Sequence, residues 1–461
     1  MAVFSVIKLS ELEGAKRIDA EYYKPEYLSL LDRLRKAVCV PAKSVAFPAR
    51  RKFNPNAKEY FDYIEISEVD LSTGEFNVSK IIGKEAPDRA QWIVDKDDVL
   101  VSTVRPIRNA VILIRENKEN LVCSSGFAVI HPYKVQANYL FLYFKIPFVA
   151  KLLNRHTTAT EYPAINWNDV LNTPIYVGRE EFQVKISFLI DESFGLLEQS
   201  RTLYSQAENL LLEELGLKDF KPKYEKTYTA KLSDTFSAHR IDAEYFQPAY
   251  EEVIRKIEDI TELKPLGKLA NRVKLKINPE NNKLYRYIEI SDVLIDIGEV
   301  NYTERLGKDL PPNARIPVKG GELIISKVRP TRGAIGIIPY CLGEDLICSS
   351  AFSVFNVNSP LKEYLYVITR SIIGKLQLEK PTKGTSYPTI EDLDVEKLRI
   401  PLLPLSTQQK IASLVQQAHE ARRKAKELLE IAKKAVEIAI EKNEEEVLDY
   451  LSKTKEIGLA G

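Results

Sequence analysis

One unit of about 225 residues is written twice along this chain, and a repeated sequence specifies a repeated structure. RIDAEYY, which begins at Arg17, returns as RIDAEYF at Arg240, and YIEIS at Tyr63 returns at Tyr287. Further matches are VSTVRPIR with ISKVRPTR, VCSSGF with ICSSAF, and TEYPAI with TSYPTI. The chain is therefore predicted to contain two copies of one fold.

Within each copy, a region of short strands and turns precedes a mostly apolar helix and then a long helix. The apolar helix is expected at 137–153 and again at 361–376. The predicted fold class is α+β, with two duplicated α+β domains that are each followed by a long helix. The expected boundaries are 1–181 for the first domain, 182–217 for the central long helix, 218–231 for the linker between copies, 232–405 for the second domain and 406–461 for the C-terminal long helix.

The two long helices carry the spacing of a coiled-coil seam. From Ser406 to about Ser452 apolar residues step alternately by three and four positions, and Phe182 to Leu215 keeps the same rhythm. Ser406 with Gln409 has the pattern of a capping box at the helix start. The two helices are therefore predicted to pair within the chain. The expected seam residues are Ile186, Leu189, Leu196, Leu203, Ala207, Leu210, Ile411, Leu414, Ala418, Ala425, Leu428 and Ala432.

The charge is balanced overall but not locally. With 44% hydrophobic residues, 28% charged residues and a net charge of +1, the composition gives no general argument for nucleic acid. However, residues 99–160 carry eight Lys or Arg against two acids, and residues 323–385 carry eight against four. Residues 406–461 balance at ten of each, as on a solvent-exposed helix with ion pairs. Any nucleic-acid contact is thus expected on the two domains.

No apolar run approaches the roughly 20 residues that cross a bilayer, and the N-terminus lacks the pattern of a secretory signal. We therefore expect a cytoplasmic protein without a membrane partner. The four cysteines, Cys39, Cys123, Cys341 and Cys348, show neither a disulfide framework nor metal-ligand spacing.

The sequence also lacks the patterns of common enzyme sites. It has no phosphate-binding loop, no dinucleotide-binding turn and no Asn/Asp-Pro-Pro-Tyr tetrapeptide of an amino-methyltransferase. Its four histidines are not matched between the copies. A nuclease-like set of Asp88, Glu116 and Lys118 has no counterpart in the second copy. We therefore predict a protein without catalytic residues, a metal site or a cofactor of its own.

What recurs is a pattern for binding. Arg105-Pro106-x-Arg108 and Arg329-Pro330-x-Arg332 each follow a predicted strand and place two guanidinium groups on one rigid turn. Arginine suits bidentate contact with guanine edges or with phosphate. Surface salt bridges are the alternative interpretation.

A second recurring segment is a loop with hydroxyl groups and a tyrosine, at 157–162 and 382–387. Such side chains suit hydrogen bonds to phosphates and base edges, and capping of the neighbouring helix and strand is the alternative role. Lys327 replaces Thr103, and Lys383 replaces Thr158, so the copies differ within the predicted site. The residues predicted to contact nucleic acid are Thr103, Arg105, Arg108, Thr157, Thr158, Thr160, Tyr162, Lys327, Arg329, Arg332, Lys383, Thr385, Ser386 and Tyr387.

This organisation resembles the specificity subunit of type I restriction-modification enzymes. The resemblance rests on two repeated domains that are each followed by a long helix, on the RIDAEYY and RIDAEYF openings, and on the run PLSTQQKI that starts at Pro404. It extends over nearly the whole chain. The first copy departs from it at 177–182, where VGREEF replaces the proline-rich turn before the helix.

The resemblance implies a non-catalytic, sequence-specific DNA-binding subunit. Each domain is then a target-recognition domain for one half of a bipartite double-stranded site, and the two helices form an antiparallel coiled coil that docks two modification (methyltransferase) subunits. S-adenosylmethionine, ATP and magnesium are expected on the partner subunits, which include a restriction or motor subunit. Two other interpretations stay open: a two-domain scaffold or interaction protein, and the recognition chain of another, type II-like, restriction-methylation system.

Overall fold

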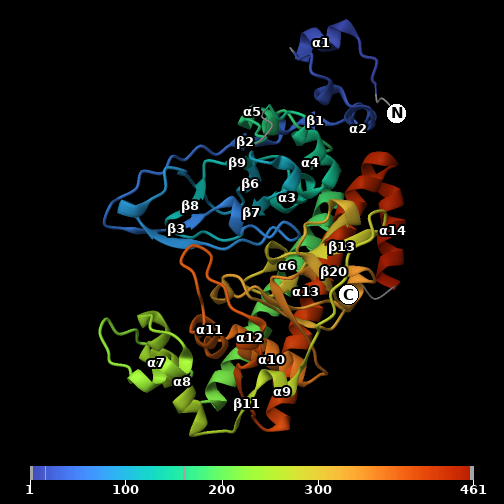
Figure 1. The fold of residues 1–461 in the computed structure, drawn as a ribbon. Helices are drawn as coiled ribbons and strands as arrows, with labels where there is room; N and C mark the ends of the chain where they lie inside the picture. The colour runs from blue at the N-terminus through green and yellow to red at the C-terminus, as the bar shows by residue number, and fades with distance from the viewer. Residues whose placement is uncertain (1–3, 16, 159–161, 457–461) are drawn as a thin grey trace. The chain divides into compact units, whose positions relative to one another are not determined.

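The computed structural model describes residues 4–15, 17–158 and 162–456 (Figure 1). The chain divides into two compact units, Met1–Leu197 with Arg422–Gly461 and Glu198–Ala421. Each unit therefore combines the sheets of one repeat with half of each long helix. Within the described ranges, no helix has both the length and the apolar character that crossing a membrane requires.

The helices follow the order expected from the repeat. Those of the first unit are α1 (Leu9–Ala15), α2 (Pro25–Lys36), α3 (Ala137–Lys145), α4 (Pro147–Asn154), α5 (Trp167–Leu171) and α14 (Glu444–Glu456). Those of the second are α7 (Leu232–Ala238), α8 (Pro248–Glu258), α9 (Leu266–Leu269), α10 (Leu361–Arg370), α11 (Ile372–Glu379) and α12 (Asp392–Glu396). The long helices α6 (Glu180–Glu214) and α13 (Leu405–Glu441) contribute to both units.

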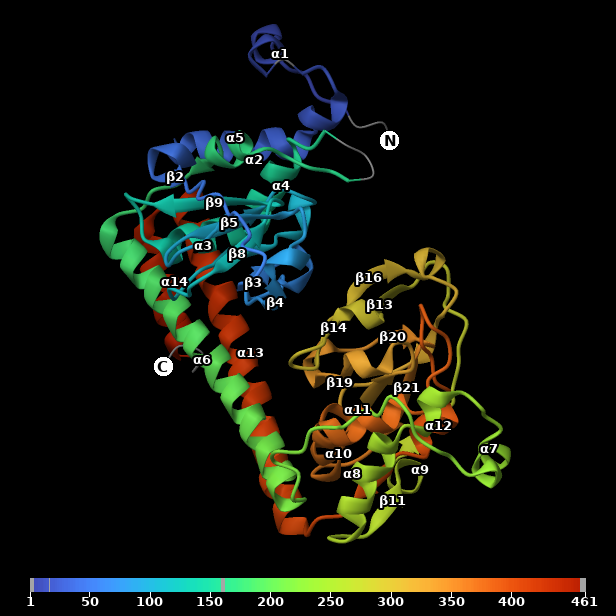
Figure 2. The same ribbon diagram turned by 90° about the vertical axis from the view of Figure 1, so that its left-hand side faces the viewer.

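Two four-stranded sheets form the body of the first unit (Figure 2). The helix-facing sheet is antiparallel, with the order β2 (Ala46–Pro48), β9 (Phe127–Pro132), β6 (Val99–Ser102) and β7 (Val111–Leu113). The second sheet has the order β4 (Ser79–Ile82), β3 (Tyr60–Ile64), β8 (Leu121–Ser124) and β5 (Ala90–Ile93), and β3 is parallel to β8. A further short pair joins β1 (Val40–Pro41) to β10 (Pro174–Ile175).

Strand β6 shows how these layers pack. Val99 and Val101 belong to the core shared with α3 and α6, whereas Leu100 belongs to the core shared with the second sheet. All three side chains are at most 1% exposed. Because successive side chains of a strand point to opposite faces, this unbroken apolar run fits a strand that is covered on both sides.

The second unit repeats both four-stranded sheets strand for strand and has one additional short strand pair. Its helix-facing sheet has the order β12 (Asn271–Arg272), β21 (Phe352–Asn356), β18 (Leu323–Ser326) and β19 (Ile335–Ile337). Its second sheet has the order β16 (Thr303–Leu306), β13 (Leu284–Ile288), β20 (Leu346–Ser349) and β17 (Ala314–Pro317), with β13 parallel to β20. Short pairs join β11 (Leu263–Pro265) to β22 (Arg399–Pro401) and β14 (Val293–Leu294) to β15 (Glu299–Val300). The predicted duplication of an α+β domain is confirmed.

The apolar helix predicted at 137–153 is in fact two helices, as is its counterpart in the second copy. Pro147 begins α4, and its ring prevents α3 from continuing. In the second copy the Ser371 hydroxyl caps the start of α11. Both breaks lie just after a buried cation that ends the preceding helix, Lys145 or Arg370.

The long helices pair in antiparallel orientation within each unit. In the first, the Ser193 hydroxyl of α6 donates a hydrogen bond to the carbonyl of Ala425 in α13, over 2.8 Å. In the second, the Ser200 hydroxyl donates to the carbonyl of Ala418, over 2.7 Å. Residue numbers rise along α6 as they fall along α13. The predicted antiparallel pairing is therefore confirmed, and α6 lies alongside α13 in Figure 2.

The predicted seam residues are buried or partly buried within the single chain. Its buried members are Ile186, Leu189, Ala207, Ile411, Ala418, Ala425, Leu428 and Ala432. Its partly buried members are Leu196, Leu203, Leu210 and Leu414. These side chains pack within one chain, so any partner that docks on the helices must use their outer faces.

The C-terminal helix differs from the single helix predicted from Ser406 to about Ser452. Helix α13 ends at Glu441, and α14 begins at Glu444. The side chain of Asn443 explains the break, because its carbonyl oxygen accepts a hydrogen bond from the backbone amide of Glu446 at 2.9 Å and so caps the new helix. Helix α14 contributes Val447 to the core of the first unit.

Candidate nucleic-acid interface

The two Arg-Pro-x-Arg turns have the same strained backbone. Arg105 has φ of 48° and ψ of 56°, and Arg329 has φ of 47° and ψ of 53°. This left-handed conformation costs a residue with a side chain about 1 kcal/mol or more, and such strain concentrates at functional sites. The following prolines, Pro106 and Pro330, are buried and begin a short 3-10 turn. Two independent copies of one strained turn indicate that the surrounding fold imposes it.

Each turn is joined to the hydroxyl-bearing loop of the same copy. The guanidinium of Arg105 lies over the ring of Tyr162, 5.3 Å from its centroid, and that of Arg329 lies 4.5 Å from the centroid of Tyr387. Both tyrosines are 68% exposed. A cation on the face of an exposed aromatic ring is a favourable contact. The fold thus brings together the arginine and the tyrosine that the sequence predicted separately.

The other predicted contact residues are distributed between surface and interior. Those that are exposed, besides the two tyrosines, are Arg108, Thr158, Arg332, Lys383, Thr385 and Ser386. Those that are half-buried are Arg105, Thr157 and Arg329. Thr160 lies outside the described residues. The Thr157 hydroxyl donates to the carbonyl of Asn154 over 2.8 Å, which fits the alternative role of helix capping.

Two predicted contact residues are engaged with the protein itself. Thr103 is 7% exposed, and its hydroxyl donates to the carbonyl of Gly126 over 2.9 Å. Its counterpart Lys327 forms an ion pair with Asp392, with 2.9 Å between Nζ and Oδ1. The role of both residues in DNA contact stays a prediction, and each would have to change its present partner to fulfil it.

A buried basic side chain donates hydrogen bonds to backbone carbonyls next to each turn. Lys145 Nζ donates to the carbonyls of Leu71, at 2.6 Å, and Asn109, at 3.3 Å. Burial lowers the pKa of Lys145 to about 7, and the ammonium of Lys433 adds to this lowering, while Asp70 opposes it. The carbonyl of Asn109 belongs to the residue that directly follows Arg108 and caps the 3-10 turn. Lys145 therefore ties this turn to the loop that precedes β4.

Arg370 has the same function in the second copy, with more contacts. Its Nη1 donates to the carbonyls of Gly333, at 3.2 Å, and Ile335, at 3.1 Å. Its Nη2 donates to Ile295, at 2.8 Å, and Asp296, at 2.7 Å. Guanidinium offers more donors in a fixed geometry than an ammonium group does. The guanidinium of Arg370 thus makes four hydrogen bonds to backbone carbonyls, whereas the ammonium group of Lys145 makes two.

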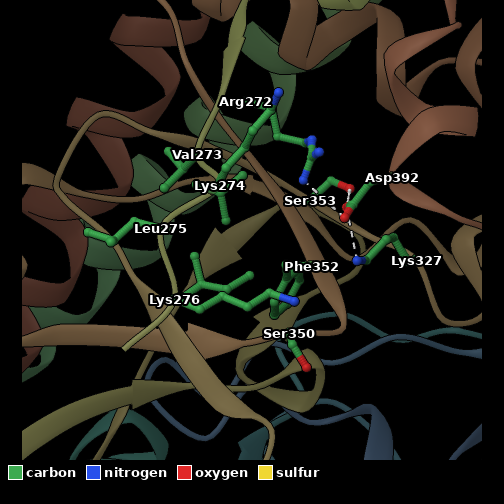
Figure 3. A pocket seen from close by; sticks show the side chains of 12 residues that line it. Arg272, Val273, Lys274, Leu275, Lys276, Lys327, Ser350, Phe352, Ser353 and Asp392 are labelled. Atoms are coloured by element: carbon green, nitrogen blue, oxygen red, sulfur yellow. Dashed lines mark hydrogen bonds and ion pairs between the residues drawn. The ribbon is translucent and has the colours of Figure 1, made fainter. Parts of the chain in front are cut away.

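A basic hollow of about 20 Å³ adjoins the second turn, and sequence reasoning did not predict it (Figure 3). Its cationic lining residues are Arg272, Lys274, Lys276 and Lys327. Arg272 and Lys327 both point to Asp392, at 3.0 Å and 2.9 Å, and the Ser353 hydroxyl donates to the same carboxylate over 2.5 Å. The run Arg272-Val-Lys274-Leu-Lys276, matched by Arg-Arg-Lys at 50–52 in the first copy, is the signal that would have found it.

The first copy has an aromatic group where the second has this ionic cluster. Trp167 stands in the place of Asp392, and its ring lies 5.3 Å from that of Trp92 at an interplanar angle of 66°. The guanidinium of Arg50 lies over Trp167, 5.1 Å from the centroid. The two copies therefore share their turns and loops but differ in the chemistry beside them.

Comparison with known protein families gives a match in the second copy. Residues 251–433 match the family model described as the type I restriction modification DNA specificity domain. The match covers less than half of the chain. The matched stretch contains the Arg329 turn, the loop at 382–387 and the basic hollow. The resemblance noted from the sequence is thereby confirmed for this part of the chain.

Three solved structures are similar to the chain over most of its length. One, described for the complex assembly and conformational transition of the type I R-M system, shares 19% identity, with 88% of this chain and 97% of that chain covered and a TM-score of 0.34. The HsdS subunit from Thermoanaerobacter tengcongensis shares 20%, with 88% and 96% covered and a TM-score of 0.33. The S subunit from M. genitalium shares 12%, with 87% and 94% covered and a TM-score of 0.37. No curated protein matches the chain.

Proposed function

We propose that the chain is the DNA-reading subunit of a type I restriction-modification system, and that it catalyses no reaction itself. Its two α+β domains each read one half of a bipartite double-stranded target. The family match at 251–433 supports this function for the second copy. The repetition of the same sheets, turn and loop supports it for the first.

The observation that carries the proposal is the pairing of a strained arginine with an exposed tyrosine, built once in each copy. Arg105 with Tyr162 and Arg329 with Tyr387 present a planar cation and an aromatic face together. The exposed Arg108 and Arg332 add a second guanidinium beside each pair. Such donors suit phosphate oxygens and the acceptor edge of guanine in the major groove.

The partners follow from the proposed role. Two modification subunits, one for each half of the repeated chain, dock on the outer faces of the long helices, and a restriction or motor subunit joins them. S-adenosylmethionine, ATP and magnesium belong to these partners. The charge on 406–461, ten bases against ten acids, suits protein contacts better than contact with DNA phosphates.

The test is to identify the target. We would express the chain with its modification subunit in a host without other methyltransferases and sequence the methylated positions of the genome. The expected result is one motif made of two specific segments separated by unspecified bases. A motif with a single uninterrupted segment, or methylation that does not depend on this chain, would contradict the proposal. The affinity of the complex for DNA should also fall steeply with salt.

A further inference from the structure

The RIDAEYY and RIDAEYF segments recur almost unchanged, and neither the turn nor the loop described above contains them. In the first copy Arg17 forms a two-pronged ion pair with Asp19, with Nε to Oδ1 at 2.8 Å and Nη2 to Oδ2 at 2.7 Å. In the second copy Arg240 pairs with Asp242 at 2.8 Å and 2.5 Å through the same atoms. The two segments therefore form the same two-pronged Arg–Asp ion pair, which we call the fork.

Each fork also binds the first residues of the nearby hydroxyl-bearing loop. Arg17 donates through Nη1 to the carbonyl of His156, at 3.2 Å, and through Nη2 to that of Thr157, at 3.3 Å. Arg240 donates through Nη1 to Pro381, at 2.9 Å, and through Nη2 to Thr382, at 3.0 Å. Two successive carbonyls are thus held by one guanidinium in both copies.

An aromatic ring fixes the plane of each guanidinium. Arg17 lies over Tyr22, and Arg240 over Tyr245, in both cases 4.6 Å from the ring centroid. A second cation contacts each of these rings: Arg155 lies over Tyr22 at 3.7 Å, and Lys380 Nζ lies over Tyr245 at 5.0 Å. With its carboxylate, its two carbonyls and its ring, the guanidinium has little freedom to move.

The burial of the two arginines excludes a role like that of Arg108 or Arg332 at the surface. The side chain of Arg17 is 24% exposed and that of Arg240 only 15%. Most of each guanidinium therefore faces the protein. Its charge is already shared with an aspartate, so it has little left to offer a phosphate.

The two ends of each loop are then held by different motifs. The start is bound by the fork, and the end is bound by the Arg-Pro-x-Arg turn, whose first amide donates to Pro163 or Pro388 over 2.7 Å. Between these points lie the side chains that the proposed function places on DNA. We infer that Arg17 and Arg240 are positioning residues for DNA recognition, each setting the loop that carries Tyr162 or Tyr387. This inference rests on the proposed function for its DNA readout only.

The experiment compares Arg240→Gln and Arg240→Lys in the full chain with its modification partner. Both variants should speed hydrogen exchange of backbone amides in residues 382–389 while exchange in α10 stays unchanged. Both should lower selectivity for one half-site about tenfold, the effect of a typical mismatch, and leave the other half-site intact. Lysine should behave like glutamine, because one ammonium group cannot hold a carboxylate and two carbonyls in a plane.

Arg255→Gln is the matched control, since Arg255 is an exposed arginine on α8 of the same copy, and it should change neither measurement. Unchanged exchange in 382–389, or equal loss at both half-sites, would overturn the inference, and so would full recovery by Arg240→Lys, which would indicate a simple charge effect. If the wild-type complex had no split target, the proposed function would fail, and the exchange measurement would still decide the positioning role.

Discussion

The backbone amide of Arg329 donates a hydrogen bond to the carbonyl of Pro388, 2.7 Å away, and Arg105 makes the same bond to Pro163 over the same distance. In both cases the donor is the residue with the left-handed backbone. The backbone therefore joins the turn to the loop independently of the arginine side chain. Removing the side chain of Arg329 should leave this backbone bond in place and remove only the hydrogen bond from its Nη2 to the carbonyl of Ser386, at 3.1 Å.

We expect Arg329→Ala or Arg332→Ala to relax recognition of one half-site only. Loss of a bidentate contact to a base costs about 1–3 kcal/mol of discrimination, or about 5- to 150-fold. The measurement is the affinity of the complex for DNA duplexes in which one half-site is randomised and the other is kept. Equal weakening on all duplexes would instead indicate a phosphate contact.

The mirror variants Arg105→Ala and Arg108→Ala should affect the other half-site. The Arg105 and Arg108 variants serve as the control for the Arg329 and Arg332 variants. If the two pairs affect different half-sites, each copy reads its own half-site, and the two copies do not share one binding surface. If all four variants weakened the same half-site, the proposal of one reader in each copy would be wrong.

A tight turn in the second copy should not tolerate a side chain. Gly298 has a φ of +61°, and a Cβ there would lie 2.6 Å from the carbonyl oxygen of Ile335 and 2.7 Å from Nη1 of Arg370. Gly298→Ala should therefore destabilise the fold by about 2 kcal/mol and loosen the cation that supports the Arg329 turn. Chemical denaturation measures the change.

Gly195 provides a control of opposite sign. It lies within α6, and a Cβ there meets nothing within 4 Å. Gly195→Ala should stabilise the protein by about 0.5–1 kcal/mol, because alanine is the better helix former. If Gly298→Ala stabilised the protein, or if Gly195→Ala strongly destabilised it, the local geometry described for these two glycines would be wrong.

The ionic cluster beside the second turn should limit the cations available to DNA. Asp392 engages both Arg272 and Lys327. Asp392→Asn should release them and steepen the dependence of log affinity on log salt by about one unit for each phosphate gained. Asp309→Asn removes the same charge from an exposed position of the same copy and is the control for net charge. Equal slopes for the two variants would argue against a local effect.

The sequence predicted the repeated α+β fold and the antiparallel helices because both depend on local patterns. The contact of Arg105 with Tyr162 could not be predicted from those patterns. It depends on a bridge between Val104 and Ala164, that is, on register between segments far apart in the chain. The sequence identified arginine and tyrosine as candidate binding residues from their chemistry. The contact between Arg105 and Tyr162 depends on the tertiary structure.

The basic hollow was missed for the same physical reason. Lys274 and Lys276 precede the Arg329 turn by about fifty residues, so no local count of charge joins them to it. Only the strand order β12-β21-β18 places the two segments in one sheet.

The break between α13 and α14 is a different case, since the cap that Asn443 supplies is a local signal within an otherwise regular helical pattern.

The buried Lys145 should make stability depend on pH. Its pKa is about 7 in the folded protein, against 10.5 for an unperturbed lysine, so between these values the unfolded chain binds the extra proton. Folding stability from this group therefore rises as pH increases from 7 towards 10.5 and is lowest below pH 7, where both states are charged. Titratable groups around it are Asp70, Glu430 and Lys433.

Lys145→Met removes this titration. We expect the difference in unfolding free energy between wild type and variant to increase from pH 7 to pH 9, by at most about 1.4 kcal/mol per pH unit, because that is the limiting slope for one proton. Denaturant titrations at pH 6, 7, 8 and 9 give the curve. Lys434→Met, at an exposed position of α13, should give a difference that stays constant over this range. A constant difference for Lys145→Met as well would show that the ammonium keeps its ordinary pKa in the folded protein.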